Sequence, residues 1–407
     1  MHVIFVEPGF PANQREFVRA LYEVGARVTG IGEAPAEYLG DQLRHWLYGY
    51  EQVPSVVHEE SMYNAVRRIQ SREWVDRLET TVEAHISPAA EIRKRCTIPG
   101  TSVETAFLCR DKPAMKEALR KAGIPCAQSI GSSSREEIED FAKRVGYPLI
   151  LKPRAGAGAS GTHRVDNDEQ LGNIMDMMGI GHGGSVAVEE FIEGHEGFYD
   201  SITINGRIVH DFASHYFPGV LEAMRTRWIS PQFIATNRID SAPDYKEVKA
   251  MGQKVVEALG IETSATHMEW FFGPKGLKFS EIGCRPPGVG AWDLYRAGND
   301  MDIYREWAHA IVHQSPSAAP SRRFSAGIIN LRPDRDGHIV GYEGLDQVMN
   351  ELESMIIDSH IPPQGTPTQS VEAGYMANAW IRLRHPDYDE LRRIMNLVGE
   401  RVQVRAA

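Results

Sequence analysis

The stretch that decides the fold is G-Y-P-L-I-L-K-P-R-A-G-A-G-A-S-G-T-H-R-V, from Gly146 to Val165. Its apolar run predicts a short buried strand that ends at Lys152, and we expect a second strand near 162–165. The loop between them holds three glycines, whose backbone N–H groups can approach a ligand closely. Such N–H groups form an anion-binding concavity, to which a lysine at the strand end adds a positive charge. The stretch therefore predicts a phosphate-binding loop, with a glycine-rich hairpin that binds nothing as the alternative.

This loop differs from two familiar phosphate-binding motifs. The lysine precedes the glycines, and a strand is expected after them. In a G-x-x-x-x-G-K-[ST] loop the lysine follows the glycines, and in a G-x-G-x-x-G turn the glycines open a helix. The N-terminal segment also lacks G-x-G-x-x-G, although its β-α-β pattern predicts a parallel sheet. A structural α/β domain is therefore expected there rather than a dinucleotide site.

Length and composition exclude several classes of protein. The chain has 407 residues, so we expect two to four structural units. A net charge of −11 disfavours a nucleic-acid or anionic-membrane surface. No apolar stretch approaches the ~20 residues of a membrane span and no signal peptide is visible, so a cytoplasmic protein is expected. The cysteines lack C-x-x-C spacing and are expected to be reduced packing residues; they are Cys96, Cys109, Cys126 and Cys284.

Lys112 lies at the predicted start of a helix. Asp111 suits the N-cap and Pro113 the first turn. A cation at a helix N-terminus is unfavourable against the helix dipole unless an anion accompanies it. Lys112 is therefore either a second phosphate contact or a solvated surface residue.

The segment from Val186 to Glu196 reads as a strand that runs into a polar turn. Glu189 and Glu196 can offer carboxylates to a nucleobase amine and to ribose hydroxyls, while the backbone of 190–192 can contact an adenine edge. Solvated acidic residues are the alternative. Beyond this segment, the Asn-Gly pair at 205–206 predicts a β-hairpin.

A second informative stretch runs from Thr266 to Glu281 and predicts a hairpin around Pro274-Lys275-Gly276. With a three-residue loop, Phe271 pairs with Phe279 and Glu269 faces Glu281. Like charges that face each other are destabilising unless a cation lies between them. Oxygen ligands suit Mg²⁺, which proteins bind through one or two carboxylates together with substrate phosphates. A metal site is predicted here, and a splayed, solvated glutamate pair in another register is the alternative.

Taken together, these motifs resemble the ATP-grasp superfamily in their order and spacing. The motifs that carry the resemblance are Asp111-Lys112, the run from Tyr147 to Val165, Glu189 to Ile192 with Glu196, His267-x-Glu269, and Glu281 with Arg285 and Gly288. The resemblance implies an α/β N-terminal parallel-sheet domain, α+β ATP-grasp subdomains and a small C-terminal α+β domain. The expected boundaries are 1–110, 111–190, 191–314 and 322–407, with 315–321 as a linker.

The resemblance also implies the roles of individual residues. ATP would be held by Lys112, Lys152, Gly156, Gly158, Ser160, Gly161, Glu189, Glu190, Phe191, Ile192 and Glu196. Glu269 and Glu281 would bind Mg²⁺ or Mn²⁺, while Lys152 and Arg285 would act in catalysis. Many members carry a metal-binding asparagine where this chain has Gly283, so the metal is expected to gain a water or to bind more loosely.

Members of the superfamily mostly phosphorylate a carboxylate to an acylphosphate, which an amine then attacks. The resemblance implies a ligase for a small acid, such as an amino acid, and an amine, with Arg225, Arg227 and Arg285 as candidates for holding the carboxylate. One alternative is a biotin-carboxylase-like or nucleotide-biosynthesis enzyme that activates a one-carbon acid. Another is a non-catalytic ATP-binding regulatory protein. The sequence leaves the substrates open, as it does the oligomeric state, for which a homodimer is one option.

Overall fold

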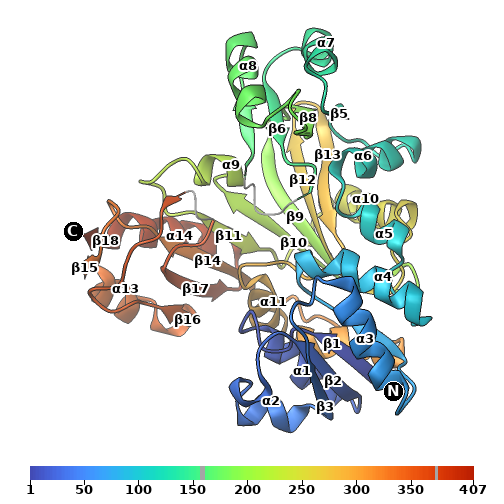
Figure 1. Ribbon diagram of the computed structural model, residues 1–407. Coiled ribbons are helices and arrows are strands. Elements are labelled where there is room, and N and C mark those ends of the chain that lie inside the picture. Colours follow the sequence, from blue (N-terminus) through green and yellow to red (C-terminus); the bar gives the residue numbers. More distant parts are fainter. Residues whose placement is uncertain (156–160, 372–374) are drawn as a thin grey trace.

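The computed structural model describes residues 1–155, 161–371 and 375–407. In Figure 1 the N-terminal segment lies at the bottom, a small sheet lies at the top, and a large sheet lies between them. The large sheet continues to the left into the C-terminal segment. None of the helices within the described ranges has the length and hydropathy needed to cross a membrane. The mixed α/β architecture agrees with the predicted fold class.

The N-terminal segment forms a parallel sheet with the strand order β3-β2-β1-β4, which confirms the parallel sheet predicted from the β-α-β pattern. Its strands are β1 (His2–Val6), β2 (Arg27–Gly32), β3 (Gly49–Gln52) and β4 (Arg77–Glu79). Its helical elements are α1 (Gln14–Glu23), η1 (Ala36–Tyr38), α2 (Asp41–Trp46), α3 (Glu59–Gln70), η2 (Glu83–His85), α4 (Ile86–Cys96) and α5 (Val103–Leu108). Helix α1 packs against α12 (Ile303–His313) in a shared hydrophobic core, where Phe17 contacts Trp307. Distant parts of the chain are thereby joined.

The small sheet is antiparallel and has the order β5-β8-β6-β7. Its strands are β5 (Ser129–Ser132), β6 (Leu149–Lys152), β7 (His163–Val165) and β8 (Val186–Glu190), and the helices beside it are α6 (Lys112–Lys121), α7 (Arg135–Val145) and α8 (Asp168–Met177). The two strands predicted around the glycine-rich loop are confirmed as β6 and β7. The predicted start of α6 is also confirmed, because the Asp111 carboxylate accepts a hydrogen bond of 3.0 Å from the Ala114 amide. This cap places Lys112 in the first turn.

The large sheet has the order β13-β12-β9-β10-β11-β14-β17-β16, and its neighbouring strands are antiparallel. Its strands are β9 (His195–Ile204), β10 (Arg207–Phe217), β11 (Gln232–Ala235), β12 (Ser264–Gly273), β13 (Gly276–Gly283), β14 (Ser325–Leu331), β16 (Ile356–His360) and β17 (Ala379–His385). The helices that precede the linker are α9 (Val220–Ala223), α10 (Tyr245–Ala258), α11 (Ala291–Asn299) and α12. Asn205 and Gly206 turn with φ angles of 50° and 79°, which confirms the hairpin predicted at this pair.

The large sheet continues past the linker at 315–321. Strand β14 pairs with β11, and β17 and β16 follow it in the same sheet. The remaining C-terminal elements are β15 (Ile339–Glu343), α13 (Leu345–Glu351), η3 (Glu353–Met355), α14 (Tyr388–Arg401) and β18 (Gln403–Ala406). The segments 191–314 and 322–407 therefore share one sheet. The sequence marks the linker by its composition, but strand partners on either side of it leave no local pattern.

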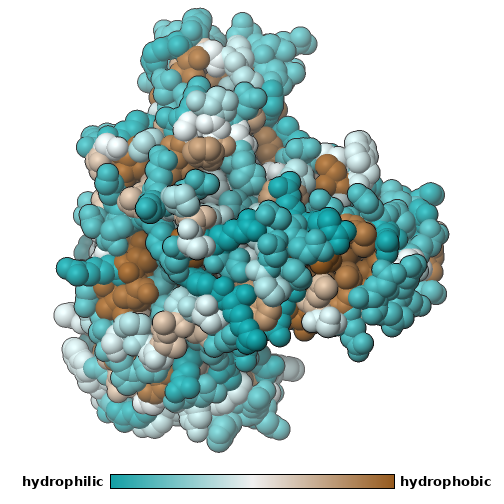
Figure 2. Space-filling model, turned by 180° about the vertical axis from the view of Figure 1, so that it is seen from behind, coloured by the Kyte–Doolittle hydropathy of each residue, from teal (hydrophilic) through white to brown (hydrophobic). Residues whose placement is uncertain are grey.

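Figure 2 shows the reverse face of the molecule as mainly hydrophilic, with hydrophobic areas that are separated from one another. Single exposed hydrophobic side chains are normal on protein surfaces. The most exposed of the large ones within the described ranges is Trp228, at 89%. It follows Arg225 and Arg227 in the segment between α9 and β11.

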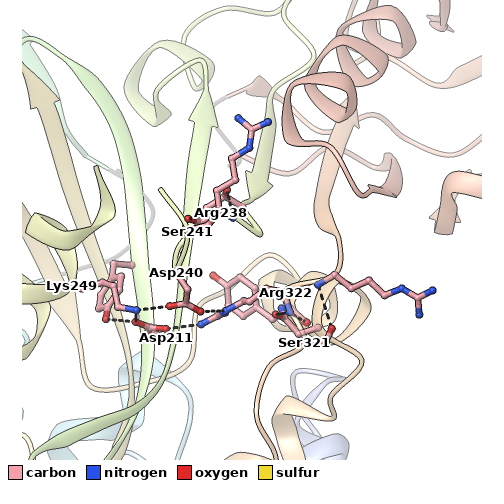
Figure 3. A network of polar contacts seen from close by, with 12 residues as sticks. Asp211, Arg238, Asp240, Ser241, Lys249, Ser321 and Arg322 are labelled. Carbon is pink, nitrogen blue, oxygen red and sulfur yellow. Dashed lines mark hydrogen bonds and ion pairs between the residues drawn. The ribbon is translucent and has the colours of Figure 1, made fainter. Parts of the chain in front are cut away.

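A closed network of ion pairs fixes the end of the linker to the large sheet (Figure 3). Arg322 contacts Asp211 on β10 at 2.7 Å and Asp240 at 2.9 Å. Lys249 on α10 contacts the same two carboxylates, at 3.0 and 2.6 Å. The Tyr199 hydroxyl also donates to Asp211, and the side chains of Arg322 and Asp211 are only 13% and 11% exposed. Each cation thus bridges both anions, which joins the linker to β10, α10 and the loop after β11.

We expect Arg322→Met to lower the melting temperature by several degrees. The substitution keeps an aliphatic side chain but leaves the mostly buried Asp211 carboxylate with one cation fewer, at a cost of about 2 kcal/mol. The control is Arg323→Met, because the Arg323 side chain is 69% exposed and lies 4.0 Å from Asp300. Differential scanning fluorimetry measures both variants. Equal melting temperatures for the two would contradict a stabilising role of the network.

Candidate active site

A cavity of about 470 Å³ lies between the small sheet and the large sheet. Its lining comes from β6 and β8 on one side and from β9, β12 and β13 on the other. The predicted residues that line it are Lys112, Lys152, Glu189, Glu190, Phe191, Ile192, Glu196, Glu269 and Glu281. Side chains that are far apart in the sequence are therefore brought together around one space.

Glu269 and Glu281 face each other across β12 and β13, as the sequence predicts. The detailed register differs from the prediction in two ways. The turn is tighter, because Gly273 pairs with Gly276, and Phe271 therefore pairs with Lys278 rather than with Phe279. A β-bulge between Glu269 and Trp270 then accommodates one extra residue of β13. The bulge offsets the shorter loop, so the predicted glutamate pair is retained while the predicted phenylalanine pair is wrong.

Glu189 holds two lysines at one wall of the cavity. Its Oε2 lies 2.6 Å from Lys116 Nζ and 3.0 Å from Lys152 Nζ. Burial opposes the charge of Glu189, but the two ammonium groups lower its pKa to about 2. Its Oε1 is buried and has no hydrogen-bond partner among the described residues. That acceptor suits a ligand that brings an N–H donor.

Lys116 belongs to the site, although the sequence reasoning missed it. Its side chain is 1% exposed, and burial lowers its pKa despite the ion pair with Glu189. Lys116 lies four residues after Lys112 in α6, so the two lysines lie on the same face of the helix. The four-residue spacing of the two lysines is the sequence feature that could have identified Lys116 as a site residue.

Lys112 and Lys152 converge on Glu281, which lies 3.3 Å from the first ammonium and 3.8 Å from the second. Burial opposes the charge of Glu281, but the lysines prevail and lower its pKa. Burial likewise opposes the charge of Lys152, and Glu189 and Glu281 raise its pKa. Two cations and two anions thus lie within ion-pair distance at one end of the cavity. In the described part of the chain, no cluster of three or more His, Cys, Asp or Glu side chains has metal-binding geometry.

Glu196 lies at the start of β9 and accepts a hydrogen bond of 2.7 Å from the Val220 amide at the start of α9. Burial raises its pKa to about 8, and the charge of Glu269 adds to this effect. A Cβ atom at Gly219 would lie 2.6 Å from a Glu196 carboxylate oxygen, so the backbone approaches this carboxylate more closely than a side chain allows. The protonated form of Glu196 is therefore favoured at neutral pH.

The predicted adenine edge and the glycine-rich loop are only partly described. The backbone from Glu190 to Ile192 lines the cavity, and the Arg164 guanidinium lies 4.6 Å from the ring centre of Phe191. Gly161 has a φ of 68°, the left-handed conformation that favours glycine. Gly156, Gly158 and Ser160 lie outside the described residues, so their predicted contacts remain predictions.

Arg285 lies beside the main cavity rather than in its lining. It borders a smaller cavity of about 20 Å³ that Lys112 and Glu281 also line. Its Nε donates to the Glu83 carboxylate at 2.7 Å, and Arg110 donates to the Glu83 backbone carbonyl. Glu83, from the N-terminal segment, therefore orients Arg285. The sequence reasoning missed Glu83 because no motif marks it.

The two other predicted arginines lie in different surroundings in the structure. Arg225 lines the main cavity and donates to the Thr162 carbonyl at 3.3 Å. Arg227 instead forms an ion pair of 2.6 Å with Asp336 of the C-terminal segment, and it is not among the residues that line the cavity. Arg225 therefore remains a candidate for a substrate contact, whereas the geometry disfavours Arg227.

Behind Glu269, a buried polar chain supports the hairpin. His267 Nδ1 lies 2.6 Å from Asp200, its Nε2 lies 3.6 Å from Glu269, and Tyr295 donates to Asp200. Burial opposes the charge of His267, but Asp200 raises its pKa to about 9. The His267-x-Glu269 spacing brings both side chains to the same side of β12.

Comparison with known families agrees with this geometry. Residues 117–298 match the family described as the ATP-grasp domain. The chain contains an ATP-grasp domain. The matched residues include Lys152, Glu269 and Glu281, and the match begins within α6, after Lys112. The resemblance inferred from the motifs is thereby confirmed.

Several curated ligases are similar to this chain. An L-arginine-specific L-amino acid ligase of Bacillus subtilis is 26% identical over 279 residues, which is 67% of this chain and 66% of the relative. Alanine–anticapsin ligase of Bacillus subtilis strain 168 is 26% identical over 231 residues, which is 52% of this chain and 48% of the relative. The matched region thus spans less than two thirds of either relative.

Two solved structures share the fold along the whole chain. An L-amino acid ligase from Bacillus licheniformis superimposes with a TM-score of 0.77 at 16% identity and covers 100% of this chain and 98% of its own. N5-carboxyaminoimidazole ribonucleotide synthetase from Thermotoga maritima gives a TM-score of 0.70 at 15% identity, with coverage of 100% and 99%. At these identities the likeness concerns the fold.

The pKa of Glu196 predicts how stability depends on pH. Between its ordinary pKa of 4.5 and about 8, the folded protein holds a proton that the unfolded chain has released. Rising pH therefore destabilises the folded state over this window, and the effect ends above the folded pKa. In ligand-free protein we expect Glu196→Gln to flatten the fall in melting temperature from about pH 5 to 8.

The control for this measurement is Glu262→Gln. Glu262 is exposed and precedes β12, so this variant is expected to keep the pH dependence of the wild type. Parallel curves for wild type and Glu196→Gln would contradict a proton on Glu196 at neutral pH.

Proposed function

We propose that this protein is an ATP-dependent ligase that joins a small carboxylic acid, such as an amino acid, to an amine and releases ADP and phosphate. The observation that carries the proposal is the convergence of Lys112 and Lys152 on Glu281, directly opposite Glu269, at one end of the 470 Å³ cavity. Such a concentration of charge suits a polyphosphate better than an apolar ligand. Two relatives are named as an L-amino acid ligase and an alanine–anticapsin ligase, and these names support an amino acid as the substrate.

The two lysines bind the phosphates of ATP in this proposal, and the other cavity residues hold the nucleoside. The unpartnered Oε1 of Glu189 accepts the adenine amino group, and the backbone of 190–192 contacts the same edge of the base. Glu196 binds the ribose hydroxyls, because a protonated carboxyl has both a donor and an acceptor. Lys116 keeps Glu189 ionised, and Glu189 in turn holds Lys152 in place.

The opposed glutamates fit a divalent cation. Both are oxygen ligands, they face each other on adjacent strands, and substrate phosphates would complete the coordination. Gly283 supplies no side-chain oxygen where many family members have an asparagine, so water is expected in its place. Bound Mg²⁺ would neutralise the charge of the phosphate oxygens.

The chemistry then proceeds in two displacements. A carboxylate oxygen of the acid attacks the γ-phosphorus of ATP. The bond between the γ-phosphorus and the oxygen that bridges it to the β-phosphate breaks, so that ADP leaves and an acylphosphate is formed. The amine attacks the acyl carbon, loses a proton, and phosphate leaves as the C–N bond forms. Phosphoryl transfer depends on positioning and charge neutralisation, which Lys112, Lys152 and the Glu83-oriented Arg285 supply.

An assay of products tests the reaction type. The protein is incubated with ATP, Mg²⁺ and a panel of amino acids, with bicarbonate and formate in parallel arms. We expect ADP and phosphate in equal amounts, dependent on an amino acid, because the γ-phosphoryl group is transferred. AMP with pyrophosphate would contradict the acylphosphate route, and turnover with the one-carbon acids alone would favour a biotin-carboxylase-like activity.

Replacement of Glu281 tests the site. We expect Glu281→Gln to lower kcat at least ~100-fold and to raise the Mg²⁺ concentration that gives half-maximal activity, because one charged oxygen ligand is lost. Glu262→Gln is the control and should retain wild-type turnover. ATP binding measured by calorimetry verifies that the Glu281 variant is folded. Unchanged turnover in that variant would contradict the proposed site and favour a regulatory ATP-binding protein.

A further inference from the structure

Two cysteines that the proposed reaction does not use lie against each other beside the active site. Cys109 and Cys284 are separated by 175 positions in the chain, yet their sulfur atoms are 2.8 Å apart. They are only 3% and 4% exposed. Both are free thiols in the structure. A disulfide bond measures about 2.05 Å, so the sulfur atoms need to approach by less than an ångström to form one.

The position of this pair connects it to the proposed catalytic groups. Cys109 ends α5 and precedes Lys112 by three residues, and Cys284 follows β13 and immediately precedes Arg285. Cys109 also lines the 20 Å³ cavity that Lys112, Glu281 and Arg285 border. The two thiols therefore lie where the N-terminal segment meets the metal-site hairpin, and the small cavity lies against Cys109.

We propose that Cys109 and Cys284 are a modification site, a dithiol that peroxide oxidises to a disulfide that restrains the phosphate-binding and metal-binding segments against each other. One thiolate attacks a peroxide oxygen, which gives a sulfenic acid and releases hydroxide. The second sulfur then attacks the sulfenic sulfur, forms the S–S bond and releases the hydroxyl group as water. In total, two thiols and one hydrogen peroxide give one disulfide and two waters.

The environment of the pair makes this oxidation slow, but it favours a disulfide between Cys109 and Cys284 over other products. The hydrogen bond with Cys284 and burial raise the pKa of Cys109, so the less reactive thiol form dominates. Once a sulfenic acid forms, however, its partner sulfur is already in contact with it. Cys126 offers a contrast, because it is more exposed and its sulfur lies 3.7 Å from the backbone carbonyl of Lys116 rather than against another thiol.

The disulfide has a predicted effect on turnover, and this part rests on the proposed function. Closing the S–S bond shifts the connection before Lys112 relative to the end of β13. A misplacement of about 1 Å can lower a rate about 100-fold, so we expect oxidation to lower ADP formation at least ~10-fold. Dithiothreitol should restore the rate, because it reduces the disulfide to the two thiols.

Mass spectrometry tests the site without any need for turnover. The full-length protein is treated with hydrogen peroxide, alkylated and digested without reductant. We expect a loss of two hydrogen atoms in the intact mass and a cross-linked peptide pair that contains Cys109 and Cys284, which disappears with dithiothreitol. Cys109→Ser and Cys284→Ser should each abolish the cross-link, and Cys126→Ser should keep it.

The outcomes separate the two proposals. Absence of the cross-link, or overoxidation of either cysteine to sulfinic acid without it, would overturn the modification site. A cross-link that leaves ADP formation unchanged in an active enzyme would overturn the restraint of catalysis. If the reduced protein shows no turnover with any acid, the ligase proposal fails while the mass measurement still decides whether the disulfide forms.

Discussion

The site depends on keeping opposite charges together in a place where water is scarce. Glu189 is buried and Glu281 is partly buried, and each remains ionised because ammonium groups lie against it. A buried charge without a partner is very costly, whereas a well-compensated one is tolerated. The lysines come from α6 and β6 and the acids from β8 and β13, so these elements are held at one spacing by their charges. These paired charges suit an ionic ligand that replaces part of the network.

Much of this arrangement could be predicted from local patterns. The Asp111 cap, the Asn205-Gly206 turn and the strand that ends at Lys152 are short-range features, and the structure has all three. The ordered motifs then identified the superfamily. The resemblance places Glu189 at the nucleobase, but no local pattern indicates that this carboxylate also contacts Lys116 and Lys152.

What could not be predicted depends on contacts between distant segments. Glu83 meets Arg285, and Cys109 meets Cys284, only after the N-terminal segment packs against the β12–β13 hairpin. The hairpin itself shows how a correct result can rest on an incorrect detail. The loop between β12 and β13 is shorter than predicted, and a bulge at Ser280 restores the pairing of the glutamates. Bulges follow from tertiary packing, and sequence periodicity alone does not reveal them.

The continuous large sheet has a consequence for how this protein can be divided. Strand β11 donates and accepts hydrogen bonds with β14, which comes from beyond the linker. A fragment cut at 315–321 would expose the unpaired edge of β11, and such edges template aggregation. The C-terminal segment therefore covers this edge of the ATP-grasp domain, and a fragment that ends at the linker is expected to be insoluble.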